Sequence, residues 1–269
     1  MDLFRREIRV EAGGKSIEPP LTIYFDSEFD DTEKINTTTI KVYNLSESTI
    51  SEIKNDSAAL LSAGYETDMG TIFEGIVKDT HTYWQGVDKI TEIECVDQHG
   101  LYLKRKVVKT FAPGTNASVV LKFLIGEAGL GIGDFDPPKD FVYRNGKTLN
   151  GIANVLLKTV VKDTNAKMHI HRGKIYIRDT SKGDQTGFVV NKDSGLIDHP
   201  EKIESEEASK EDKKKNARIG WKVKMLLNHR VTVDSIIVLQ SKVVSGTFRV
   251  TKGRHYCDGN SFYTEVECF

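Results

Sequence analysis

The chain repeats one short strand-like phrase. "TEIEC" occupies residues 91–95 and "TEVEC" occupies residues 264–268, which is 264 − 91 = 173 positions later. In both, Thr, an aliphatic residue and Cys alternate with two glutamates, the period-two pattern of a strand with one buried face. A metal site, a disulfide between Cys95 and Cys268, and a duplicated structural unit would each explain the repeat, and they imply different proteins.

The flanking residues favour a duplicated unit. Each phrase follows a Gly-Thr pair, an aromatic-bearing strand pattern and a polar turn, and the phrase begins 21 residues after Gly70 and 18 after Gly246. A weaker echo opens the two blocks, with "KVYNL" at residues 41–45 and "KMLLN" at residues 224–228. Several features in matched order indicate an internal repeat. We therefore interpret the chain as two related β domains that flank an inserted one.

Cysteine usage fits this interpretation. The chain has 3 cysteines at wide spacing, and an odd number does not make a disulfide framework. Reduced, buried thiols are the simpler expectation. Cys95 and Cys268 would then occupy matching buried positions in two separate domains, which would keep them apart.

Helical signals lie in the middle of the chain, between two strand-rich ends. Residues 115–130 carry apolar side chains at helical spacing and end in glycines. Residues 149–161 predict a second helix, with Leu149 and Ile152 on its apolar face. The segment "MHIHRGKIYIRD" predicts a tight hairpin. Its expected turn and cross-strand pairs are Arg172-Gly173, Ile170 with Ile175, and Met168 with Ile177.

These patterns predict a mainly β fold with an α+β insert, in which two related small β-barrels flank a small α+β domain. The expected domains are residues 1–100, 101–185 and 186–269. An exposed charged loop is expected at about residues 201–216, where acids and lysines nearly cancel.

Charge and hydropathy exclude several classes of protein. Lys+Arg total 38 against 39 for Asp+Glu, which argues against a general binder of nucleic acid or anionic membranes. The start of the sequence has no apolar stretch long enough for a signal peptide, and no run approaches a membrane span. We expect a chain made in the cytoplasm, with no membrane anchor.

Two loop-like motifs are interpreted as structural. "GEAGLGIGD" at residues 126–134 follows a helix, whereas glycines that cradle phosphate open one, so it predicts a helix stop and turn. "DSEFDD" at residues 26–31 has alternating oxygens but lacks the Gly and Glu of a calcium loop, so an acidic hairpin tip is expected.

No motif predicts a metal, a cofactor or catalysis. His169 with His171, and His255 with Cys257, are pairs that lack the third and fourth ligands a zinc site needs. The sequence has no Gly-x-Ser-x-Gly, His-Glu-x-x-His or Cys-x-x-Cys. We therefore predict no catalytic, cofactor-binding or metal residues.

The ordered set of motifs resembles a known family. It runs through "IKVYNLSESTISEIK", "AGYE", "TIFEGIV", "GEAGLGIG", "LNGIANVLLKTVVKDTNAKMHIHRGKIYIRD", "SGLIDHPEKIE", "GWKVKMLLNHRVTVDSIIVLQS" and "GTFRVTKGRHYCDGNSFYTEVECF". In this order, across nearly the whole chain, it resembles the phage tail baseplate hub proteins of contractile tails. That group includes proteins of myophages, prophages and phage-tail-like bacteriocins.

The resemblance implies a structural, non-enzymatic role in the virion tail baseplate, assembled in the bacterial host cytoplasm. Two tandem barrels per chain would form a homotrimer with six near-equivalent positions, joining a sixfold tail tube to a threefold spike. The implied partners are the chain itself, the tail tube protein, the central spike protein, other baseplate proteins, and DNA that passes through the lumen without specific binding.

Two other functions stay open. A tail-associated cell-wall hydrolase is one, although no appended peptidase or lysozyme domain is recognised. A carbohydrate-binding β module is the other, and it is disfavoured because the chain has 2 Trp, neither in an obvious stacking cluster.

The glutamates of the repeated phrase are candidate lumen residues. They lie on the polar side of their strands, where a hydrated sheet face is the simplest expectation, and a glycosidase acid would need burial in a cleft. An acidic wall would repel phosphates and prevent DNA from sticking. The hypothesis is that four side chains contribute to a lumen wall: Glu92, Glu94, Glu265 and Glu267.

Overall fold

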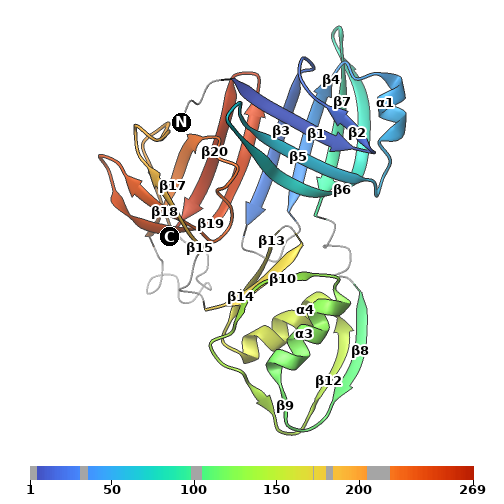
Figure 1. The fold of residues 1–269 in the computed structure, drawn as a ribbon, viewed down its shortest axis with the longest axis vertical. Helices are drawn as coiled ribbons and strands as arrows, with labels where there is room; N and C mark the ends of the chain where they lie inside the picture. Colours follow the sequence, from blue (N-terminus) through green and yellow to red (C-terminus); the bar gives the residue numbers. More distant parts are fainter. Residues whose placement is uncertain (1–4, 31–35, 98–104, 172, 180–183, 205–218) are drawn as a thin grey trace. The chain divides into compact units, whose positions relative to one another are not determined.

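The computed structural model describes residues 5–30, 36–97, 105–171, 173–179, 184–204 and 219–269. The chain forms two compact units. Unit 1 contains residues 1–30, 36–96 and 183–269, and unit 2 contains residues 31–35 and 97–182. Strands dominate the molecule and helices are few, so the predicted mainly β fold is confirmed (Figure 1).

Unit 1 begins with a set of strands that we call the first β-module. Its antiparallel strands follow the order β3-β4-β7-β6-β5-β1-β2. Helix α1 is capped by the Ser46 side chain, which accepts a hydrogen bond from the N–H of Thr49. The elements are β1 (Arg6–Ala12), β2 (Lys15–Ile17), β3 (Ile23–Asp30), β4 (Thr37–Tyr43), α1 (Glu47–Glu52), β5 (Ala58–Tyr65), β6 (Asp68–Gln85) and β7 (Asp88–Val96).

The rest of unit 1 forms the second β-module. Its order, β16-β17-β20-β19-β18-β15, matches β3-β4-β7-β6-β5-β1 of the first, and no described strand corresponds to β2. Strand β15 also runs parallel to β18, whereas β1 runs antiparallel to β5. The strands are β15 (Asp184–Val190), β16 (Glu201–Glu204), β17 (Ile219–Leu226), β18 (Ser235–Gln240), β19 (Ser245–Asp258) and β20 (Ser261–Cys268).

The two hairpins that end in the repeated phrase match residue for residue. Thr91 lies opposite Thr82 in the β6–β7 hairpin, and Thr264 lies opposite His255 in the β19–β20 hairpin. Both pairs differ by the same offset of 173. A β-bulge interrupts both hairpins at the same place, after Val77 and after Val250. Since bulges are specific features of a sheet, their coincidence indicates a duplicated backbone.

The weaker echo is also part of the duplication. Lys41 on β4 lies opposite Glu92, and Lys224 on β17 lies opposite Glu265. The Gly-Thr pairs, by contrast, are not equivalent. Gly246 falls at the position of Phe73 under the 173-residue offset, so the predicted correspondence with Gly70 is wrong by three residues.

The repeated cysteines lie in separate cores. Cys95 packs in the core of the first module and Cys268 in that of the second, and both are reduced. Burial raises the pKa of each thiol to about 12. A disulfide between them is excluded, as the sequence predicts.

Strand β3 joins the modules into one continuous sheet. It pairs with β4 on one edge and with β19 on the other, where Phe25 to Asp30 lie opposite Cys257 to Lys252. The segment of residues 26–31 is therefore not an acidic hairpin tip. Its residues through Asp30 belong to β3, because Phe25, Ser27 and Phe29 alternate into buried positions.

The start of the charged stretch also differs from expectation. A loop is predicted at about residues 201–216, but Glu201–Glu204 pair with β17 as strand β16. The remaining residues, 205–216, lie outside the described part of the chain.

Unit 2 places helices α3 and α4 together over short strands (Figure 1). Helix α3 ends in a Schellman motif, in which the N–H of Leu130 donates to Ile125 O and that of Gly129 to Gly126 O. This confirms the predicted helix stop. The elements are β8 (Lys106–Phe111), β9 (Thr115–Asn116), α3 (Ala117–Glu127), β10 (Gly131–Asp136), β11 (Val142–Tyr143), β12 (Lys147–Ile152), α4 (Ala153–Asp163), β13 (Lys167–His171) and β14 (Lys174–Arg178).

The β13–β14 hairpin has the predicted register, with Ile170 opposite Ile175 and Met168 opposite Ile177. The second helix starts later than predicted. Leu149 and Ile152 belong to β12, which pairs with β8 and so cannot join the helix. No helix in the described part of the chain is long and apolar enough to cross a bilayer.

Candidate assembly surface

One side of the continuous sheet in unit 1 carries alternating acids and bases. We call it the charged face. It runs across β17, β20, β19, β3, β4 and β7, and directly opposed residues place its side chains on the same side of the sheet. Its members include Lys222, Lys224, Glu265, Glu267, Lys252, Arg254, Asp26, Glu28, Lys41, Glu92 and Glu94.

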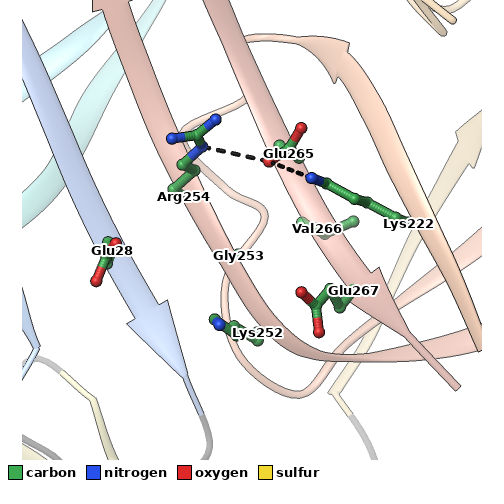
Figure 2. A pocket seen from close by; sticks show the side chains of 8 residues that line it. All are labelled: Glu28, Lys222, Lys252, Gly253, Arg254, Glu265, Val266 and Glu267. Atoms are coloured by element: carbon green, nitrogen blue, oxygen red, sulfur yellow. Dashed lines mark ion pairs between the residues drawn. The ribbon is translucent and has the colours of Figure 1, made fainter. Parts of the chain in front are cut away.

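Glu265 is largely enclosed, with a side chain 18% exposed, against 27% for Glu92 and 48% for Glu94. Figure 2 shows two cations that reach it from both neighbouring strands. Lys222 Nζ lies 3.2 Å and Arg254 Nε 3.3 Å from its Oε1. A pocket of about 280 Å³ lies here, lined by Glu28, Lys222, Lys252, Gly253, Arg254, Glu265, Val266 and Glu267.

Glu92 has a matching environment in the first module. Lys41 Nζ lies 3.1 Å from its Oε2, and the Tyr83 hydroxyl donates to the same oxygen at 3.4 Å. The neighbouring aromatic contact is also duplicated. His81 stacks on Tyr83 with ring centroids 5.6 Å apart, as Arg254 lies 5.1 Å from the ring of Tyr256 in the second module.

Glu94 and Glu267 lie nearer the strand ends. Lys78 Nζ lies 3.0 Å from Glu94 Oε2, with both side chains exposed. Glu267 lies opposite Lys222 on one side and Lys252 on the other. The face is therefore mixed in charge rather than purely acidic.

The structure places all four glutamates on the charged face but not in one cluster. The pair on β7 and the pair on β20 are separated by β4, β3 and β19, or roughly 19 Å at ~4.8 Å per strand. Sequence reasoning missed the neutralising cations. The alternation of Lys222 and Lys224 with apolar residues on a strand could have indicated them.

Asp26 occupies the middle of the face, at the β3–β19 junction. Burial raises the pKa of its carboxyl, although Arg254 Nη1, 3.5 Å from Oδ2, opposes that shift. Tyr24, Tyr43 and Tyr256 line the pocket of about 460 Å³ in which it lies.

The junction is held on its buried side by side chains that cross between modules. Phe29 of β3 packs in the second core, with its ring 5.0 Å from that of His255. Cys257 and Phe262 of the second module pack in the first core. At the surface, Arg230 of the second module adds a bidentate contact to Asp68 of the first, at 2.5 and 2.7 Å.

The candidate metal pair of His255 and Cys257 gains no further ligand among the described side chains. His255 is buried, its Nδ1 is 2.9 Å from Thr264 Oγ1, and Cys257 lies in an apolar core. The side chains of His169 and His171 lie outside the described residues. Among the side chains that are described, no group of three potential ligands could hold a metal ion.

No family model matches the sequence, and no curated protein matches it either. Solved structures do match the fold. A 43 kDa tail protein of prophage MuSo2 from Shewanella oneidensis has a TM-score of 0.71 at 10% identity, covering 98% of each chain. A tail protein from Neisseria meningitidis has a TM-score of 0.68 at 8% identity, covering 98% of this chain and 96% of that one.

A third similar structure is an Escherichia coli component of the type VI secretion system, described as structurally similar to the T4 bacteriophage tail proteins gp27 and gp5. Its TM-score is 0.62 at 8% identity, covering 93% of this chain and 74% of that one. The chain therefore has the fold of phage tail proteins across both units, which confirms the structural side of the resemblance drawn from its motifs.

Proposed function

We propose that the chain is a structural baseplate hub protein of a contractile phage tail or phage-tail-like particle, without catalytic activity. The observation that carries this proposal is the duplicated β-module, whose hairpins share one register and one bulge position. With two equivalent modules in each chain, three chains can present the six equivalent contact surfaces that a sixfold partner requires. The tail-protein fold across 98% of the chain supports the same conclusion.

In the proposed assembly, three copies form a ring of six near-equivalent modules. One side of the ring binds the sixfold tail tube and the other binds the threefold central spike and other baseplate proteins. Such rings stack through many modest contacts, so multivalency replaces a single strong site. The ring belongs to the virion tail baseplate and assembles in the host cytoplasm.

The charged face would line the lumen. Glu92, Glu94 and Glu265 repel phosphates, while their lysine and arginine partners keep the wall from being uniformly negative. A wall of mixed charge presents no continuous basic track for the DNA backbone, and a basic track is what gives nonspecific binding its strength. DNA would therefore pass without being held.

The test is to locate the chain in assembled particles. Cells that express the complete tail gene set are used to purify tails, and gold-labelled antibodies against this chain are imaged by electron microscopy. Labels confined to the baseplate end are expected. Labels along the tube or sheath, or particles that lack the chain, would reject the hub, and cell-wall clearing by the purified protein in a zymogram would favour a hydrolase.

A further inference from the structure

The second half of β6 has an open edge where its counterpart in the other module is covered. On β19, residues Lys252–Cys257 pair with β3. The 173-residue offset makes Asp79–Trp84 on β6 their counterparts, and within the described part of the chain these residues pair only with β7. The N–H and C=O groups along such an edge can pair with a further strand.

Side-chain exposure shows the same difference. Cys257 is 6% exposed and His255 is 1% exposed, because β3 and its neighbours cover them. Their counterparts on the open edge are Trp84, which is 71% exposed, and Thr82, which is also exposed. Trp84 therefore presents a large apolar side chain to solvent beside the open strand edge, where a pairing strand would cover it.

The strand that would cover this edge is identified by the same equivalence. Strand β16 pairs with β17 as β3 pairs with β4, with Glu201 opposite Lys222 as Asp26 is opposite Thr39. Lys222 in turn lies opposite Glu267, and Thr39 lies opposite Glu94. These two glutamates are the last in each repeated phrase. Strand β16 is also the last strand of its sheet, so its outer edge is open among the described residues.

We propose that β16 of one copy pairs antiparallel with the second half of β6 in the next copy, in the register of the β3–β19 junction. This inference rests on the proposed ring of copies and names the joint that holds it. Transferring the observed register predicts three cross-copy pairs: His81 with Ile203, Thr82 with Lys202, and Tyr83 with Glu201.

The side chains on the charged side of this joint are complementary. Within the chain, Arg254 reaches across the junction to Asp26, at 3.5 Å. Their counterparts are His81 and Glu201, again a base and an acid on the same diagonal. Because the two edges differ, the contact is head-to-tail, and repetition of a head-to-tail contact closes into a ring when the rotation allows it.

The test is cross-linking in assembled particles. A chain with Thr82→Cys and Lys202→Cys is expressed with the complete tail gene set, and the purified tails are oxidised mildly. Directly opposed strand residues have Cα atoms about 4.5–5.5 Å apart, within disulfide range. We expect dimers and trimers on non-reducing gels, and little background because the three native cysteines are buried.

The matched control pairs Thr82→Cys with Glu204→Cys, which is two residues out of register and about 7 Å further along the strand. It should yield little cross-linking. If the particles contain the chain but the in-register pair does not cross-link, or the two pairs cross-link equally, the joint is rejected and the hub stands. If particles assembled with the parent chain lack it, the proposed function itself fails.

A second pair of variants tests the joint without cysteines. Trp84→Asp should leave the urea midpoint of the purified chain unchanged, because the side chain is already exposed, but should reduce incorporation into tails by about tenfold. Val87→Asp is the control, since Val87 is 90% exposed at the hairpin tip outside the joint. Equal incorporation of the two variants would overturn the proposal.

Discussion

The two β-modules share a backbone more faithfully than they share side chains. Their turns before β5 and β18 place Asp56 and Asp234 at the same left-handed φ of 66°. The N–H of Asp56 donates to Val77 O at 2.8 Å, and that of Asp234 to Val250 O at 2.9 Å. Register, bulge and turn are thus repeated, whereas most of the side chains on them have changed.

The modules differ in the pairing of one strand edge and in the surroundings of the repeated turn. The second half of β19 pairs with β3, whereas the equivalent stretch of β6 pairs only with β7 among the described residues. Asp234 is buried beside Arg249, whereas Asp56 is exposed. The second module takes this partner strand from its own chain, and the proposed joint would supply the equivalent strand to the first module from a neighbouring copy.

The largest effect is expected from breaking the internal junction. Phe29→Ala removes a ring that is 6% exposed in the second core, and truncations of this kind cost about 3–5 kcal/mol of unfolding free energy. The counterpart substitution, Glu204→Ala on exposed β16, should change it by less than about 0.5 kcal/mol. Urea denaturation measures both, and similar losses would contradict the difference between the two edges.

The duplicated turn offers the next comparison. Asp234→Asn tolerates the left-handed backbone but removes the carboxylate charge beside Arg249, whose side chain is 18% exposed. Loss of one partner from a largely buried pair should cost about 3 kcal/mol. Asp56→Asn, at the exposed counterpart, should have almost no effect on the urea midpoint. Equal effects of the two substitutions on the urea midpoint would mean that the ion pair between Asp234 and Arg249 does not stabilise the second module.

The thiols of Cys95 and Cys268 should make similar contributions to the pH dependence of stability. Burial raises the pKa of Cys95 and Cys268 from 9.0 to about 12, so their contribution to stability is present below pH 9 and is lost as the pH rises toward 12. Linkage predicts a loss of about 1.4 kcal/mol per thiol at pH 10. Comparing unfolding at pH 8 and pH 10 for the parent and for Cys95→Ala with Cys268→Ala isolates this loss. An equal change in unfolding free energy between pH 8 and pH 10 for the parent and for the double variant would refute this prediction.

The smallest effects concern the charged face. Glu265→Gln breaks contacts to two cations at an 18% exposed side chain and should cost about 1 kcal/mol, whereas Glu92→Gln, at 27% exposure, should cost about 0.5 kcal/mol. Double-mutant cycles with Lys222→Met and Lys41→Met give the coupling energies. Coupling energies near zero at both sites would mean that these ion pairs do not stabilise the fold. The proposed role in the lumen would then be the remaining role of the glutamates.

Much of the backbone could be predicted because its signals are local. The alternation around Cys95 and Cys268 predicted their burial, and the Arg172-Gly173 turn predicted the register of its hairpin. The start of α4 could not be predicted as well. Leu149 and Ile152 fit a helical face, and only pairing with β8 decides that they are in a strand.

The junction could not be predicted, because it depends on pairing between distant segments. Asp26 and Arg254 are 228 positions apart, and no local pattern assigns β3 to β19. A signal for the repeated turn was nevertheless present. "DS" precedes an apolar strand at Asp56 and again at Asp234, but the turn repeats at an offset of 178 rather than 173, so a single-offset comparison misses it.

The symmetry of the ring is the most direct test of the proposed hub. Electron cryomicroscopy of the baseplate end, averaged without imposed symmetry, should show three copies of the chain with their six β-modules spaced evenly about one axis. Six copies that each contribute a single module to the ring, or a chain that does not encircle the axis, would contradict the role proposed for the duplication.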